Sequence, residues 1–218
     1  MKQIKFSICT ASLFMLMSCV DLNLNPLSEG SSENWYSSQA EIEMSLNDFY
    51  RTDFFPIDDM KWGDDVTARN ETSAVNNGTL TSEDGTIAKR WENYYKGIAR
   101  ALRIINNMDR ARAMGVSEKD IAQYEGEAYF YLGYAYGMLA FHWGDAILDK
   151  VGMSLDEAYT ASRSPKADVL AYSYECLDKA AERLPNSYPG IQRATKGAAY
   201  AFKARIAIYN EDYAAAAT

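Results

Sequence analysis

The chain has 218 residues, 48% of them hydrophobic and 24% charged, with a formal net charge of −8 at pH 7. A surface this acidic argues against binding nucleic-acid phosphates or anionic lipid head groups by charge. The length and the apolar content are sufficient for a sizeable hydrophobic core, so we expect a folded globular protein.

The N-terminus has the pattern of a secretory signal. Two lysines precede a mostly apolar run over residues 6–17, which is shorter than the ~20 residues of a membrane-spanning helix. The run ends in LMSC, which resembles a bacterial lipobox, the motif whose cysteine is lipidated and becomes the mature N-terminus. We therefore predict a lipoprotein signal peptide in residues 1–18 and lipidation at Cys19. The alternatives are an ordinary signal peptide and a buried N-terminal helix.

Removal of this segment takes away two lysines and no acid, which changes the net charge from −8 to −10. Attachment to a membrane would then come from acyl chains, and more than one chain is needed for stable anchoring. Of the three cysteines, Cys9 lies in the signal and Cys19 is the predicted lipid site. Cys176 therefore remains alone, and we expect no intramolecular disulfide.

The rest of the chain carries helix signals and almost no strand signals. Ser38 and Glu41 are spaced as a capping box for a first helix, which we expect to end near Arg51. Residues 52–86 are rich in Asp, Asn, Thr and Gly and have no sustained period, which predicts a long irregular loop. A second helix is predicted by an apolar stripe at helical spacing, formed by Trp91, Tyr95, Ile98, Leu102, Ile105 and Met108.

A third helix is predicted from about Glu118 to His142, with a cap at Ser117 and a stop at Gly144. Its centre, EGEAYFYLGYAYGMLAF, is apolar or aromatic nearly all round. Such a helix is packed on several sides, so its tyrosines are expected in the core.

Three more helices are expected towards the C-terminus. One opens at Pro165 and stops at Pro185, the next covers about 192–209, and the last starts at Asp212. The final stretch, GAAYAFKARIAIYNEDYAAAAT, resembles a tetratricopeptide hairpin, in which small residues let two helices approach closely. No clean repeat period runs through the chain. The predicted fold class is all-α, an irregular tetratricopeptide-like helical stack with a long irregular loop.

Five segments together resemble the SusD/RagB-like outer-membrane lipoproteins of Bacteroidota. They occur in the family's order and are CVDLNLNP, WENYYKGIARALRIINNMD, EAYFYLGYAYGMLAFHWGD, CLDKAAERLP and RATKGAAYAFKARIAIY. Two departures affect packing more than ligand binding. The arginines that usually flank the Glu-Ala helix are absent around Tyr129 and Gly133, and Ala146 stands where a proline often follows Gly-Asp.

The resemblance implies a function and a location. A family member of this kind is anchored by its lipid to the outer membrane, faces the cell exterior, and captures a nutrient, most often a glycan. It passes the nutrient to a TonB-dependent SusC-type transporter. Known members are much longer, so we expect residues 19–218 to be the N-terminal part of a larger helical domain or a truncated gene product.

The residues argue against an enzyme. A single histidine, His142, excludes a site built from two histidines, and no zinc-spaced cysteine pair, glycine-rich phosphate loop or GxSxG elbow is present. The pairs Asp58–Asp59 and Asp64–Asp65 lack EF-hand spacing and are typical of a solvated loop. We expect no catalytic residue, no metal and no cofactor.

The predicted ligand site lies in the irregular loop. Sugars have apolar ring faces and many hydroxyls, so a glycan site combines a flat aromatic ring with amide, carboxylate or guanidinium groups. Trp62, Asp65, Arg69 and Asn70 supply this set. The alternative is a solvated loop with Trp62 packed into the helices.

Two other functions remain compatible with the same helices. A peptide-capturing RagB-type subunit would differ only in its ligand site. A tetratricopeptide-like scaffold would bind a protein partner through its concave face and would need no small ligand.

Overall fold

The computed structural model describes residues 35–56 and 74–217, and its helices belong to one compact unit that begins at Tyr36. The helices in chain order are α2 (Gln39–Asn47), the 3₁₀ helix η2 (Asp48–Tyr50), α3 (Gly85–Asn106), α4 (Met108–Ala113), α5 (Glu118–Trp143), α6 (Leu155–Thr160), α7 (Lys166–Arg183), α8 (Lys196–Tyr209) and α9 (Tyr213–Ala216). In these two ranges the β-type pairing is a single antiparallel bridge between Ala146 and Ser164. The all-α prediction is confirmed.

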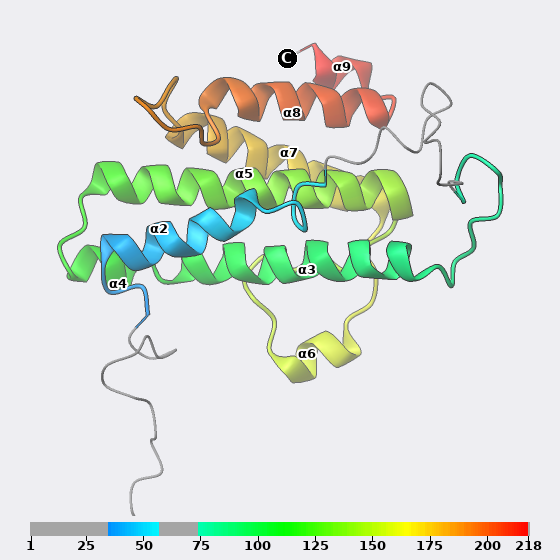
Figure 1. Cartoon of the computed structure of the whole chain (residues 1–218), viewed down its shortest axis with the longest axis horizontal. Helices are drawn as coiled ribbons and strands as arrows, with labels where there is room; N and C mark the ends of the chain where they lie inside the picture. The colour runs from blue at the N-terminus through cyan, green and yellow to red at the C-terminus, as the bar shows by residue number, and fades with distance from the viewer. Residues whose placement is uncertain (1–34, 57–73, 218) are drawn as a thin grey trace, which may run out of the picture. The chain divides into compact units, whose positions relative to one another are not determined.

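Helix α5 is the central element of this unit. It packs against α3 on one side and against α7 and α8 on the other, with α2 laid across it (Figure 1). The hydroxyl of Ser117 caps its first turn by accepting a hydrogen bond from the Asp120 N–H at 3.2 Å, and Gly144 ends it with a φ of 74°. Both ends therefore agree with the sequence prediction to within one residue, and the predicted burial of the helix on several sides is confirmed.

Helices α5 and α7 approach each other closely at Gly133. The Ser173 hydroxyl donates a hydrogen bond of 2.6 Å to the Gly133 carbonyl oxygen. A Cβ at position 133 would lie 2.5 Å from Leu177 Cγ and 2.9 Å from the carbonyl oxygen of Ser173. Because interiors are close-packed, only glycine fits this contact without a shift of backbone.

We expect Gly133→Ala to lower the free energy of unfolding by about 1–3 kcal/mol, because the added methyl group overpacks the α5–α7 contact. Chemical denaturation monitored by circular dichroism measures the change. Gly85→Ala at the start of α3 is the control, since nothing lies within 4 Å of its added Cβ. Equal stability of the Gly133 variant and the unchanged protein would contradict this packing.

The first two predicted helices are present with different bounds. The capping box of Ser38 and Glu41 opens α2 as expected, and η2 follows it directly. Helix α3 begins earlier than its apolar stripe, because the Asp84 carboxylate accepts a hydrogen bond from the Thr86 N–H at 2.8 Å and so caps it. The predicted second helix is also interrupted at Asn107, and α4 is a separate short helix.

The connection between α5 and α7 contains a helix that the sequence reading did not predict. Helix α6 opens with a capping box of Ser154 and Glu157, but it has only six residues and none of them is buried. The connection is held by the Tyr136 hydroxyl, which donates to the Asp149 carbonyl oxygen at 2.8 Å and accepts from its N–H at 2.9 Å.

The C-terminal helices agree with the predicted hairpin. Helix α8 starts at Lys196, later than expected, because the Thr195 hydroxyl accepts a hydrogen bond from the Ala198 N–H at 3.2 Å. The Asp212 carboxylate caps α9 in the same way, through the Ala215 N–H at 3.1 Å.

Cys176 lies buried in α7, and burial raises the pKa of its thiol to about 12, so the thiol stays protonated at neutral pH. None of the helices placed by the structure combines the length and the apolar composition needed to cross a membrane.

Candidate ligand-binding site

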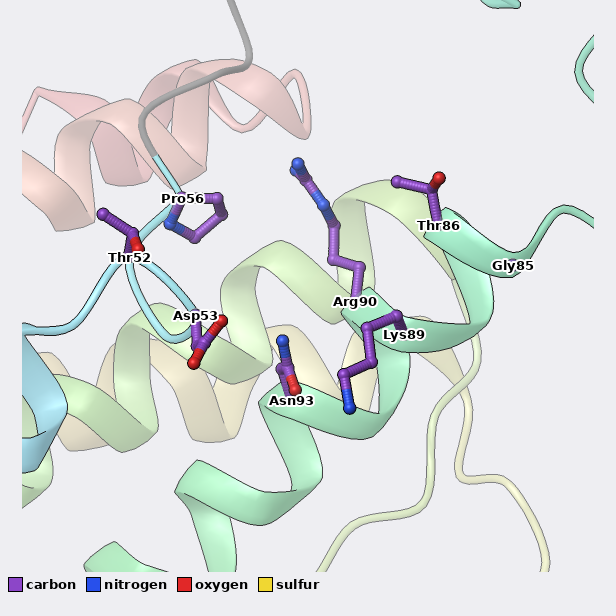
Figure 2. A pocket seen from close by; sticks show the side chains of 8 residues that line it. All are labelled: Thr52, Asp53, Pro56, Gly85, Thr86, Lys89, Arg90 and Asn93. Carbon is purple, nitrogen blue, oxygen red and sulfur yellow. The ribbon is translucent and has the colours of Figure 1, made fainter.

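The described residues form an open hollow between the turn that follows η2 and the N-terminal part of α3 (Figure 2). Its volume is about 410 Å³, which falls in the range of small-molecule sites. It is lined by Thr52, Asp53, Pro56, Gly85, Thr86, Lys89, Arg90 and Asn93.

One side of the hollow is residues 52–56, which we call the 52–56 wall. Its turn is closed by the N–H groups of Phe54 and Phe55, which both donate to the Arg51 carbonyl oxygen at 3.0 Å. The Phe54 ring is buried and meets the Tyr131 ring edge-on, with the ring centroids 5.8 Å apart. The centroids of the Phe55 and Tyr134 rings are 4.5 Å apart. The two phenylalanines thus fix the turn on α5 and leave its polar residues at the hollow.

The other side of the hollow is the exposed face of α3. Thr86, Lys89, Arg90 and Asn93 occupy positions i, i+3, i+4 and i+7, so they share one face of the helix. The opposite face of α3 carries the buried residues Ile98 and Leu102. The amphipathic pattern that buries α3 therefore leaves these polar side chains on the side of the hollow, where Figure 2 shows Arg90 and Lys89 extending from the helix in different directions.

Charged groups of the hollow make weak surface pairs. Lys89 Nζ lies 3.1 Å from a Glu92 carboxylate oxygen, and Arg51 Nη2 lies 3.1 Å from an Asp53 carboxylate oxygen. All four side chains are about half exposed, so each pair contributes little to stability. A ligand hydroxyl can therefore replace either partner at small cost.

The chemistry of the hollow suits a hydroxylated ligand. The Asp53 carboxylate accepts hydrogen bonds, the Lys89 and Arg90 side chains donate them, and the Asn93 amide does both. In the described part of its lining there is no aromatic ring. Groups of three or more His, Cys, Asp or Glu that could hold a metal ion do not occur among the described residues.

The predicted site residues lie outside the described ranges. This holds for Cys19 and for Trp62, Asp65, Arg69 and Asn70. The segment 57–73 follows Pro56, a lining residue, directly in the sequence.

Two residue groups outside the predicted site have a structural role. The Asn77 side-chain oxygen, in the same loop, accepts from the Thr79 N–H at 3.1 Å and from its hydroxyl at 2.6 Å, so it closes a turn. Tyr131 and Tyr136, expected in the core, are completely buried, which confirms that expectation.

The sequence reading did not predict Asp53, Lys89, Arg90 or Asn93 as site residues. Lys89, Arg90 and Asn93 lie on α3. The sequence pattern that could have indicated them is the polar face of this helix, opposite its apolar stripe. Because most helices show such a face to water, the pattern does not distinguish a binding surface from a solvated one.

The described residues thus form a helical scaffold that presents an open polar hollow on its surface. The family model described as "Starch-binding associating with outer membrane" matches residues 29–208, so the chain belongs to the SusD-like family. The resemblance read from the five sequence segments is confirmed.

Relatives of the chain agree with this assignment. The chain is 24% identical to SusD-like protein P2 of Formosa agariphila, over 94% of this chain and 43% of that protein. A solved SusD-like carbohydrate-binding protein from Bacteroides fragilis NCTC 9343 superposes with a TM-score of 0.71 at 22% identity, over 84% of this chain and 40% of the other. A structure solved with xylogluco-oligosaccharide gives a TM-score of 0.62 at 18% identity, over 76% and 34%. The chain spans less than half the length of each of these proteins.

Proposed function

We propose that the protein binds a glycan at the outer membrane and delivers it to a TonB-dependent SusC-type transporter. The observation that carries the proposal is the polar hollow beside the start of the long loop, in a chain of the SusD-like family. The family description names starch binding and association with the outer membrane. A similar structure contains xylogluco-oligosaccharide. Within this proposal residues 19–218 are the N-terminal part of a longer ligand-binding domain, and the protein has no catalytic role.

The proposed ligand site combines two sets of residues. Asp53 and Asn93 of the hollow supply hydrogen-bonding groups. The aromatic ring that stacks on a sugar comes from Trp62, and Asp65, Arg69 and Asn70 supply further polar groups. This second set rests on the sequence pattern alone.

Replacing Trp62 with Ala should weaken glycan binding by about 1–3 kcal/mol, the scale for losing one stacked aromatic ring, with little change in melting temperature. Isothermal titration of the full chain with malto-oligosaccharide and with xylogluco-oligosaccharide measures the affinity, and calorimetric melting measures stability. Asn93→Ala should also weaken binding, because it removes a donor and an acceptor from the hollow.

The matched control is Tyr159→Ala. Tyr159 is an aromatic residue of α6 that is 81% exposed and does not line the hollow. Its removal should leave both affinity and melting temperature unchanged. A Trp62 variant with unchanged affinity and a large loss of stability would place Trp62 in the core. Binding of peptides but of neither oligosaccharide by the unchanged protein would favour the peptide-capturing alternative.

Attachment to the membrane is proposed to depend on the lipid at Cys19. Cys19→Ala should release the protein from the outer-membrane fraction, since the proposed attachment depends on the acyl chains at this residue. Cell fractionation followed by immunoblotting measures the distribution. A Cys19→Ala variant that still sediments wholly with the outer membrane would show a different anchor.

A further inference from the structure

A charged residue lies at the centre of the most buried helix. The Glu127 side chain in α5 is only 1% exposed, and both of its carboxylate oxygens accept hydrogen bonds of 3.0 Å from Arg193 Nε. Moving a carboxylate out of water costs several kcal/mol unless it is paired and hydrogen-bonded. Arg193 belongs to the connection between α7 and α8, so this pair joins that connection to α5.

Glu127 also holds the end of η2. The Tyr50 hydroxyl donates a hydrogen bond of 2.8 Å to Glu127 Oε2 and accepts one of 2.9 Å from the Ala194 N–H. The Tyr50 ring is 42% exposed, but its hydroxyl has both partners inside the fold. Burial and the negative charge of Glu127 raise the pKa of Tyr50, so the hydroxyl remains a donor at neutral and moderately alkaline pH.

Arg193 reaches the other end of η2. Its Nη1 donates a hydrogen bond of 2.7 Å to Asn47 Oδ1, the residue that precedes η2, and its guanidinium lies 5.5 Å from the centre of the Tyr50 ring. We call Asn47, Tyr50, Glu127 and Arg193 the Glu127 network. The network therefore holds both ends of η2.

The end of η2 is where the 52–56 wall begins. Arg51, which follows Tyr50, provides the carbonyl oxygen that closes the turn of the wall. The Tyr50 ring also stacks on Phe55 with a centroid distance of 6.4 Å. The Tyr50 side chain is thus connected to the wall in two ways: through the peptide unit that joins it to Arg51, and through its ring contact with Phe55.

We propose that the Glu127 network positions the 52–56 wall for ligand binding, with Tyr50, Glu127 and Arg193 as positioning residues that do not touch the ligand. The inference rests on the proposed function for its effect on affinity. A buried ion pair is weak evidence for stability, because well-packed apolar residues of similar volume serve as well or better. The hydrogen bonds of Glu127 and Tyr50 add a directional constraint at the end of η2 to the packing of Phe54 and Phe55 on α5.

The same helix supplies a matched control. Glu125 lies two residues before Glu127 and is paired with Arg112 at 3.2 Å and with Arg183 at 3.3 Å. Its hydrogen bonds join α5 to α4 and α7 and do not involve the wall. Glu125→Gln and Glu127→Gln therefore make the same chemical change on one helix, and only the second touches the Glu127 network.

The test compares Tyr50→Phe, Glu127→Gln and Glu125→Gln in the full chain. Amide hydrogen exchange of residues 54 and 55 reports the order of the wall without any ligand. Titration with the malto-oligosaccharide or xylogluco-oligosaccharide that binds the unchanged protein reports the affinity. Tyr50→Phe keeps the ring and removes only the hydroxyl, so it preserves the fold even where Glu127→Gln does not.

We expect Tyr50→Phe and Glu127→Gln to speed exchange in the wall by about tenfold or more, because the wall then opens locally. Affinity should fall by roughly three- to tenfold in the same two variants, which corresponds to about 0.7–1.4 kcal/mol. Glu125→Gln should change neither quantity, even if it lowers the melting temperature.

Unchanged exchange of the wall in Tyr50→Phe and Glu127→Gln overturns the inference. Faster exchange with unchanged affinity would also overturn the inference, because the network would then order the wall without affecting ligand binding. That result would not bear on whether the protein binds a glycan. Equal effects of Glu125→Gln and Glu127→Gln would show a general loss of stability in place of positioning. If the unchanged protein binds neither oligosaccharide, the proposed function fails, and hydrogen exchange alone still decides whether the network positions the wall.

Discussion

Replacing Tyr131 with Ala should lower the free energy of unfolding by about 3–5 kcal/mol, as for other large aromatic side chains removed from a core. Tyr131 is completely buried in α5. Its ring stacks on Phe49 with centroids 4.7 Å apart and an interplanar angle of 8°, and it meets Phe54 and Phe55 edge-on. Its loss removes the contact that holds three phenylalanines from the N-terminal segment on α5. Chemical denaturation of the full chain measures the change.

The control for this variant is Tyr131→Phe. The Tyr131 hydroxyl is buried, and no hydrogen-bond partner for it occurs within residues 35–56 and 74–217. Because an unsatisfied buried hydroxyl is costly, its removal should leave stability unchanged or raise it by up to about 1 kcal/mol. A Phe variant as unstable as the Ala variant would mean that the hydroxyl, and not the ring, makes the important contact.

The parts of the fold that the sequence predicted well are local. Ser38 and Ser117 were recognised as helix caps and Gly144 as a helix end, because each acts on backbone groups within a few residues of itself. The burial of α5 followed from its unbroken apolar composition. Helix α6 was missed although its capping box is visible in the sequence, since its six residues are too few to show a sustained apolar period.

The candidate site was less predictable because its contacts are not local. Asp53 and Asn93 line one hollow although they come from either side of the long loop. The bonds of the Glu127 network join residues 66, 77 and 146 positions apart. One signal was available: an acid at the centre of a helix predicted to be buried all round needs a partner of opposite charge. The sequence does not identify the partner, because many arginines and lysines could reach it.

The second large effect concerns the Glu127–Arg193 ion pair. Glu127→Leu alone should lower the free energy of unfolding by about 3–5 kcal/mol, because it leaves the mostly buried guanidinium of Arg193 without its counter-charge. Arg193→Leu alone should cost a similar amount, since the Glu127 carboxylate would then be buried unpaired. Denaturation curves of both single variants and of the double variant give the coupling between the two positions.

The double variant separates stability from positioning. With both charges replaced by Leu, no buried charge remains, so the double variant should be clearly more stable than either single variant. The Tyr50 hydroxyl would still have lost its carboxylate acceptor and Asn47 its guanidinium donor, so the 52–56 wall should remain as mobile as in the single variants. Hydrogen exchange of residues 54 and 55 in the double variant measures this. If the free energy of unfolding recovers but residues 54 and 55 still exchange fast, the ion pair serves to fix the geometry of the wall. If both recover, apolar packing alone fixes the wall. Additive losses of stability would instead show that Glu127 and Arg193 act independently, each through its other partners in the network.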